Sequence, residues 1–208
     1  NTGFILTENY VMLQTTNGGI DWKSKLLPRG AKGICYLGNI IAIPGNNGNN
    51  PGSTIYKSTD CGLSWSLITL PYVIKNLSML DNSNWYASTS EDSFLKSSDG
   101  GNTWNLIPLG LNMSSYRIIF TDVNNGYLCG QGISGGTYSA LIAKTSNSGN
   151  NWTVLYLTPY QQSLDMTVIN DSTFFTVGKE SIYTPPYGYN YKALILYSNN
   201  YGDSIITN

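Results

Sequence analysis

Short apolar runs alternate with polar segments rich in Asn, Ser, Thr and Gly along the whole chain. The runs contain β-branched and aromatic residues, and runs of this kind between Gly- and Asn-rich segments predict β-strands. Even the longest of them, such as residues 193–197, has only the length of a strand. That is far below the stretch of about 18 apolar residues that a membrane-spanning helix needs. The pattern therefore predicts an all-β protein built from short strands.

One polar phrase of eight residues recurs five times between these runs, at residues 15–22, 58–65, 97–104, 145–152 and 198–205. Each copy has Ser or Thr first, Asp or Asn two residues later and Gly two residues after that, and it ends in Trp, or in Ile in the last copy. The defining residues are Asn17, Gly19, Trp22, Asp60, Gly62, Trp65, Asp99, Gly101, Trp104, Asn147, Gly149, Trp152, Asn200 and Gly202. A repeat of this kind predicts an array of equivalent structural units.

Each copy lies between two strand-like runs, which predicts a β-hairpin with the copy as its turn. The Asp or Asn side chain accepts backbone N–H groups within such a turn, and the Ser or Thr hydroxyl does the same more weakly. The Gly supplies a positive φ without a steric penalty. The Trp folds back over the hairpin and buries apolar surface. We therefore predict that the phrase is a structural turn that caps itself.

Successive copies are 43, 39, 48 and 53 residues apart, measured between their final residues. A four-stranded propeller blade takes about 40–50 residues. The strand-like runs are residues 32–37, 39–43, 53–58 and 64–70, then 74–80, 85–88, 93–97 and 103–109, then 116–121, 127–130, 139–145 and 151–157, and finally 163–169, 174–177, 192–198 and 204–207. We expect a single β-propeller domain over residues 1–208, of four-stranded antiparallel blades at about 1–28, 29–71, 72–110, 111–158 and 159–208.

The first of these blades is expected to be incomplete. Its first run, residues 3–7, corresponds to the second strand of the other blades, so that its innermost strand is missing. Two alternatives follow, a five-bladed ring with a defective seam and a part of a larger ring of about six to eight blades. The chain begins at Asn1 rather than Met, which is expected of a processed form or of a fragment.

The repeated phrase resembles the Asp-box, or bacterial neuraminidase repeat, whose Ser-x-Asp-x-Gly-x-Thr-Trp form is matched by Ser97, Asp99, Gly101 and Trp104. The whole repeat looks most like those of photosystem II stability and assembly factors, in which a Gly-aromatic strand ending in Gly precedes the box, as at residues 125–130. The resemblance spans the whole chain and implies a propeller. It implies little about function, since sialidases, xyloglucan hydrolases, sortilin-type receptors and assembly factors all share such boxes.

All five copies are third-to-fourth turns of their blades, so we expect the variable connections on the opposite face, at residues 44–52, 71–72, 108–115, 131–137, 158–162 and 181–191. Variable loops on a rigid scaffold often carry function. Tyrosine rings offer flat amphipathic surfaces that suit sugar or protein binding. The candidate ligand-binding residues are Tyr160, Tyr183, Tyr187, Tyr189 and Tyr191. The alternative is that these rings pack on neighbouring loops and close the pore.

The composition excludes several kinds of chemistry. The chain has no His, which removes the Ser-His-Asp triad and imidazole-bound zinc. It has two arginines, Arg29 and Arg117, too few for the arginine triad with which sialidases hold a substrate carboxylate. A carboxylate pair for glycoside hydrolysis remains, although the Asp and Glu residues lie in the repeated phrase or near strand ends. We expect a protein that is not an enzyme, with no catalytic residue, cofactor or metal.

Charged residues make up 11% of the chain, the net charge is −1, and the basic residues are scattered, so we expect no nucleic-acid partner and no membrane insertion. The low charge, the polar surface and the resemblance favour a secreted or cell-surface protein, part of a larger chain or complex. Our leading hypothesis is a non-enzymatic propeller that binds a protein or glycan partner through its loop-rich face. The alternatives are a structural spacer or decoration module in a larger extracellular or virion-like assembly and, less favoured, a glycosidase.

Overall fold

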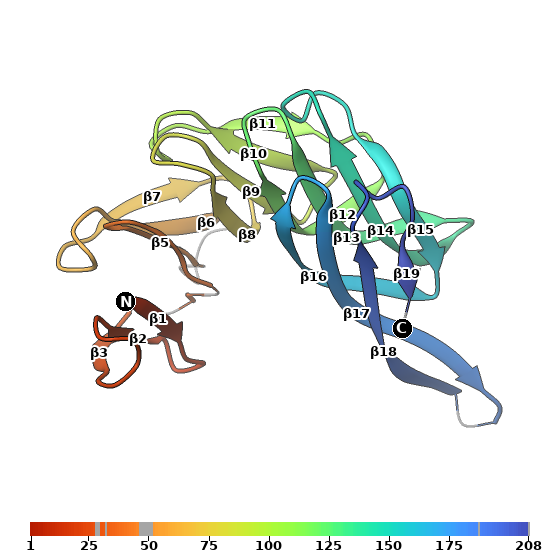
Figure 1. The fold of residues 1–208 in the computed structure, drawn as a ribbon, viewed down its shortest axis with the longest axis horizontal. Helices are drawn as coiled ribbons and strands as arrows, with labels where there is room; N and C mark the ends of the chain where they lie inside the picture. The colour runs from red at the N-terminus through yellow and green to blue at the C-terminus, as the bar shows by residue number, and fades with distance from the viewer. Residues whose placement is uncertain (28–29, 32, 46–51, 187, 208) are drawn as a thin grey trace. The chain divides into compact units, whose positions relative to one another are not determined.

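Antiparallel strands make up the regular structure of the chain (Figure 1). The computed structural model describes residues 1–27, 30–31, 33–45, 52–186 and 188–207. Within these ranges, no helix has the length and apolar character needed to cross a membrane. The chain divides into two compact units, residues 1–79 and 80–208, and each is described by itself.

The first unit contains a three-stranded sheet of order β1-β2-β3 and a four-stranded sheet of order β4-β5-β6-β7, and it ends with strand β8. The smaller sheet agrees with the expectation that the first blade lacks one strand. Met12, Ile41 and Ile43 are almost fully buried members of a core cluster in this unit. The strands are β1 (Gly3–Leu6), β2 (Val11–Thr15), β3 (Lys23–Leu26), β4 (Cys35–Leu37), β5 (Ile40–Gly45), β6 (Ser53–Ser58), β7 (Ser66–Leu70) and β8 (Ile74–Met79).

The second unit contains strands β9 to β19, and neighbouring strands of each sheet follow one another along the chain. The sheet orders are β12-β13-β14-β15, β16-β17-β18-β19 and β11-β10-β9-β8, and the last of these includes β8, which belongs to residues 1–79. The strands are β9 (Trp85–Thr89), β10 (Ser93–Ser97), β11 (Asn105–Pro108), β12 (Met113–Phe120), β13 (Gly126–Ser134), β14 (Thr137–Thr145), β15 (Thr153–Pro159), β16 (Gln161–Asn170), β17 (Thr173–Thr184), β18 (Gly188–Ser198) and β19 (Ile206–Thr207).

The β12–β15 sheet contributes to two cores of the second unit, because alternate residues of a strand point to opposite faces. Leu128 belongs to a cluster with Tyr86 and Phe120, whose stacked rings have centroids 3.8 Å apart. Its neighbour Tyr127 belongs to a different cluster with Phe174 of β17. Burying an aliphatic or aromatic side chain of this size stabilises a protein by about 1.5–3 kcal/mol. These two cores hold the sheets on which the groove described below is built.

The repeated phrase forms the turn before the last strand of each sheet. In the third copy, Ser97 Oγ accepts the N–H of Gly101 at 2.8 Å, and Asp99 Oδ1 accepts the N–H of Thr103 at 2.9 Å. Trp104 Nε1 then donates to the carbonyl oxygen of Gly101 at 2.9 Å. These bonds close the turn on itself. Hydrogen bonds from Thr103, first of all from its hydroxyl, lower the pKa of Asp99 to about 2, and Ser64 does the same for Asp60.

The glycines that define the phrase also permit close packing. Gly149 has φ +86, and a Cβ placed on it would lie 2.5 Å from Cζ of Phe94. Gly202 has φ +89, and its Cβ would lie 2.4 Å from Cδ1 of Leu155. Any side chain at these positions would collide with the core of the preceding sheet. Glycine is therefore needed both for the backbone conformation and for the contact between sheets.

The strand boundaries differ from the sequence prediction mainly in the last two sheets. Residues 131–137 and 181–191, which we expected to be loops, are mostly strand, because β13–β14 and β17–β18 continue to pair as far as Ser134↔Thr137 and Thr184↔Gly188. Ile133 in the first segment and Ile182 with several Tyr residues in the second favour the extended conformation. The expected connection at 158–162 is reduced to Tyr160, because β15 ends at Pro159 and β16 begins at Gln161. Most of the expected loop at 44–52 lies outside the described residues.

Candidate binding groove

Two hairpins of the second unit extend past the strands that flank them. The β13–β14 hairpin continues beyond Gly132 and Ser139, where its pairing with β12 and β15 ends. The β17–β18 hairpin likewise continues beyond Glu180, where its pairing with β16 ends. Both extensions lie at the ends of their strands opposite the repeated phrase, since β14 and β18 run from the hairpin turn towards the first residue of the phrase.

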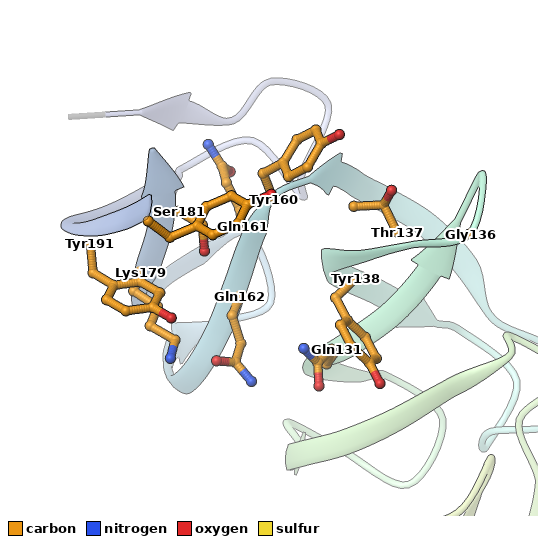
Figure 2. A pocket seen from close by; sticks show the side chains of 11 residues that line it. Gln131, Gly136, Thr137, Tyr138, Tyr160, Gln161, Gln162, Lys179, Ser181 and Tyr191 are labelled. Carbon is orange, nitrogen blue, oxygen red and sulfur yellow. The ribbon is translucent and has the colours of Figure 1, made fainter. Parts of the chain in front are cut away.

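A pocket of about 500 Å³ lies between these two hairpins (Figure 2). Its lining comes from β13, β14, β16, β17 and β18, from the turn between β13 and β14, and from the single residue between β15 and β16. Tyrosine and glutamine dominate it, and Lys179 is the one charged residue among the described residues of the lining. The lining residues are Gln131, Gly136, Thr137, Tyr138, Tyr160, Gln161, Gln162, Lys179, Ser181, Tyr189 and Tyr191.

Tyr160 connects the two sides of this pocket through its backbone. Its N–H donates to the carbonyl oxygen of Tyr138 at 3.0 Å, and its carbonyl oxygen accepts the N–H of Ser181 at 2.7 Å. One peptide segment is thus bonded to both hairpins. Tyr160 has φ +62, a conformation that is uncommon for a residue with a side chain and that often marks a functional position.

Two short hydrogen-bond chains hold the glutamine side chains of the pocket. Gln162 Nε2 donates to Tyr116 Oη at 2.9 Å, and Tyr116 Oη donates to Gln131 Oε1 at 3.2 Å. Tyr156 Oη donates to Gln161 Oε1 at 2.6 Å, and Gln161 Nε2 donates to Glu180 Oε1 at 3.2 Å. These bonds fix the orientation of three amides, so that they are in place before a ligand arrives.

The tyrosine rings of the pocket are largely exposed. Tyr138 is 66% exposed, Tyr160 55%, Tyr189 57% and Tyr191 65%. Lys179 Nζ lies over the ring of Tyr191, 4.6 Å from its centroid (Figure 2). A cation in that position is attracted by the electron-rich face of the ring. The pocket therefore presents aromatic surface and oriented amides, with its positive charge held against an aromatic ring.

The structure brings together most of the tyrosines that the sequence singled out. Tyr160, Tyr189 and Tyr191 line the pocket. Tyr183 lies beside it, in a hollow that also contains Tyr160 and Tyr189, and its ring centroid is 5.3 Å from that of Tyr189. Tyr187 lies outside the described residues.

Sequence reasoning missed the other half of the pocket, above all Tyr138, Lys179 and the three glutamines. The segment at 131–137 was named only as a variable connection. The signal that would have found Tyr138 is its place two residues after the Gly135–Gly136 turn, as the second residue of β14. The glutamines lie in the connections expected at 131–137 and 158–162, but nothing in the sequence distinguishes them there, since the pairing of strands far apart along the chain assembles them.

A second hollow of about 260 Å³ adjoins the first and contains two carboxylates, Glu91 and Asp92. The carboxylate of Asp92 accepts the backbone N–H groups of Leu111, Asn112 and Met113 at 2.9–3.4 Å, which ties the connection after β11 to the turn before β10. Glu91 is exposed. Among the described residues, no group of three or more His, Cys, Asp or Glu side chains is placed to hold a metal ion.

The fold is shared with known β-propellers. The chain is similar to the solved structure of YCF48 bound to D1 peptide, with 15% identity, a TM-score of 0.61 and coverage of 100% of this chain and 77% of that one. It is similar to the GH74 xyloglucanase from Xanthomonas campestris, with 10% identity, a TM-score of 0.67 and coverage of 99% and 43%. It is also similar to the Penicillium chrysogenum α-L-arabinanase complexed with arabinobiose, with 12% identity, a TM-score of 0.59 and coverage of 100% and 69%.

Likeness at these identities shows the fold, a β-propeller of antiparallel sheets, and no more. No protein-family model and no curated protein matches the chain.

Proposed function

We propose that this propeller is a non-enzymatic binding module, secreted or displayed at a cell surface, that holds a protein or glycan partner at the groove between its two extended hairpins. The observation that carries the proposal is the pocket between β13–β14 and β17–β18, with four exposed tyrosine rings and three oriented glutamines. Rigid aromatic surface with few rotatable bonds binds at a low cost in conformational entropy. Amides that are already oriented reduce that cost further.

Binding fits this pocket better than catalysis. No Asp or Glu occurs among the described residues that line the central pocket. Glu180 is next to it but accepts a hydrogen bond from Gln161, and Asp92 in the adjoining hollow is bonded to backbone N–H groups. A glycosidase of the usual kind needs two carboxyl groups that face each other across the scissile bond.

The neighbours support partner binding of either kind. YCF48 is a propeller solved with a bound D1 peptide, which supports a protein partner. The arabinanase was solved with arabinobiose, which supports a glycan partner. Export is supported by the low charge of the chain and its abundance of Asn, Ser, Thr and Tyr. Fractionation of the source cells tests that part of the proposal, and recovery in the cytoplasm alone would contradict it.

Equilibrium binding to two arrays, one of immobilised oligosaccharides and one of peptides, tests the proposal. We expect saturable binding to members of at least one array, weakened about 10-fold or more by Tyr138→Ala and by Tyr191→Ala, because loss of an exposed ring removes contact area at the groove. Tyr201→Ala is the matched control, since Tyr201 is 53% exposed and belongs to the turn of the last repeated phrase. Binding that survives both groove substitutions would show that the partner sits elsewhere and would favour the spacer alternative.

The glycosidase alternative depends on Glu91, because it is the exposed carboxylate of the described residues in the adjoining hollow. The xyloglucanase and the arabinanase share the fold and are named for hydrolysis. If the chain hydrolysed an oligosaccharide, Glu91→Gln would abolish the activity. We expect no hydrolysis by the wild-type protein, measured as release of reducing ends, and hydrolysis lost on Glu91→Gln would replace our proposal with the glycosidase.

A further inference from the structure

Three hollows of the second unit adjoin one another in a row. The central pocket of about 500 Å³ shares Gln131 and Tyr138 with the hollow of about 260 Å³ on one side. It shares Tyr160, Ser181 and Tyr189 with a hollow of about 300 Å³ on the other side. The two outer hollows share no lining residue with each other among the described residues. A row of adjoining hollows fits an extended chain-like ligand better than a compact one.

Tyrosines stand at both junctions of this row. Tyr138 lines both the central pocket and the smaller hollow, and Tyr160 and Tyr189 line both the central pocket and the third hollow. All three rings are more than half exposed. Each offers an apolar face and a polar hydroxyl edge to whatever crosses the junction.

The hydrogen-bonding groups of the central pocket suit a ligand that both donates and accepts. Each amide carries two N–H donors and a carbonyl acceptor. Gln131 uses its oxygen and Gln162 uses its nitrogen within the protein. In the described part of the chain, Gln131 Nε2 and Gln162 Oε1 have no partner, so one amide offers a donor and the other an acceptor. A hydroxyl group both donates and accepts, and it satisfies either amide.

Three charged groups at or beside the central pocket are engaged within the protein, and the exposed carboxylate of Glu91 lies at one end of the row. Lys179 lies over the Tyr191 ring, Glu180 accepts a hydrogen bond from Gln161, and Asp92 accepts backbone N–H groups. An anionic or cationic ligand would therefore gain little from these groups. We propose, resting on the proposed function, that the groove binds an extended, uncharged oligosaccharide. The C–H faces of its sugars pack on Tyr138, Tyr160 and Tyr189, and its hydroxyls bond the Gln131 and Gln162 amides.

A peptide fits these observations less well. Peptides that lie along a sheet are held by main-chain hydrogen bonds to a strand edge. At the groove, the carbonyl oxygen of Tyr138 and the N–H of Ser181 are already bonded to Tyr160. A sugar chain repeats an apolar ring face and polar hydroxyls along its length, which matches the repeated tyrosines and the amides between them.

The test uses the whole chain and measures dissociation constants for neutral gluco-, xylo-, galacto- and arabino-oligosaccharides of two to six sugars, for uronic-acid oligosaccharides, and for an array of peptides. We expect one neutral series to bind more tightly as its length increases, with little change between about 50 and 500 mM salt, since screening weakens only charge interactions. Tyr138→Ala and Gln131→Met should each weaken binding about 10-fold, whereas Tyr138→Phe and the control Tyr201→Ala should stay within about 2-fold.

Each other result has a distinct meaning. Peptide binding without glycan binding, lost on Tyr138→Ala, would overturn the oligosaccharide inference and leave the proposed function standing. Binding confined to uronic-acid oligosaccharides and weakened by salt would overturn the uncharged ligand. Affinity that does not change with oligosaccharide length would overturn the row of subsites. If the chain bound neither the oligosaccharides nor the peptides, the inference and the proposed function would both be overturned.

Discussion

The Asp or Asn of the repeated phrase and its glycine have different structural roles. The Asp or Asn oxygen accepts the N–H four residues later in every copy, as Asp99 does from Thr103 and Asn147 does from Asn151. Because an amide oxygen makes the same bond as a carboxylate oxygen, Asp and Asn alternate freely among the copies. The glycine does not vary, since it has a positive φ in every copy, and at Gly149 and Gly202 it also contacts the preceding sheet.

At the residue scale, Gly149→Ala should lower the free energy of unfolding by about 2–4 kcal/mol, because it adds a clash with Phe94 to an unfavourable φ of +86. Gly136→Ala is the matched control. Gly136 has φ +77 but no atom within 4 Å of its added Cβ, so it should lose only about 1 kcal/mol. Urea unfolding measures both values, and equal losses would show that the glycine is needed for its backbone conformation alone.

Two of the five turns contain a carboxylate with a lowered pKa, which makes them sensitive to acid. Hydrogen bonds to the ionised form lower the pKa of Asp60 and Asp99 to about 2, from an ordinary value of 3.8. Their contribution to stability is therefore complete above pH about 4 and is lost as the pH falls towards 2. The double variant Asp60→Asn, Asp99→Asn should fold and should show a shallower decline in melting temperature over that range. An unchanged decline would place the acid sensitivity elsewhere, for instance at Asp81 or Asp122, whose pKa values are also lowered.

At the scale of elements, the two extended hairpins are the feature that the sequence pattern described least well. The positions of the strands before and after each repeated phrase were predicted closely, and Ser93–Ser97 and Ser53–Ser58 agree at both ends. The hairpin extensions were taken for loops because Gly135–Gly136 and the Pro185–Pro186 pair interrupt the apolar pattern. Pairing across each hairpin continues up to these turns and overrides the local composition.

The extensions should exchange their backbone amide hydrogens faster than the bodies of the same strands. Residues 174–177 of β17 pair with both β16 and β18, whereas residues 181–184 pair with β18 alone. A strand with one partner opens at a lower free-energy cost than a strand between two. Hydrogen exchange followed by mass spectrometry should show earlier deuteration of 181–184 and 188–191 than of 174–177. Equal protection would mean that a further contact covers the β17–β18 extension.

At the scale of the molecule, the spacing of the repeated phrase predicts the class of fold because each interval has room for four short strands. The structure has this architecture, with one sheet of three strands and four sheets of four strands among the described residues. The groove was predicted only in part. Tyr189 and Tyr191 lie together in one short tyrosine-rich segment of the sequence, whereas Tyr138, Gln131 and Lys179 join them only when β13, β14 and β17 come together.

The cores on either side of the β12–β15 sheet make it the centre of the second unit. Leu128→Ala should therefore lower the free energy of unfolding by about 2–5 kcal/mol, because Leu128 is fully buried in the cluster that also contains Tyr86 and Phe120. Leu106→Ala on β11, where the side chain is 40% exposed, is the control and should cost much less. Denaturant unfolding followed by tryptophan fluorescence measures both, and similar losses would contradict the central place of this sheet.

Tyr160 is the only residue between the β12–β15 sheet and the β16–β19 sheet, so the connection between the two sheets is as short as one residue. A hinge needs residues that can change their backbone angles, and here one peptide segment is already bonded on both sides. The width of the opening between the hairpins is therefore fixed. Inserting one glycine after Tyr160 would let this width vary. Selectivity among partners of different width would then be lost first.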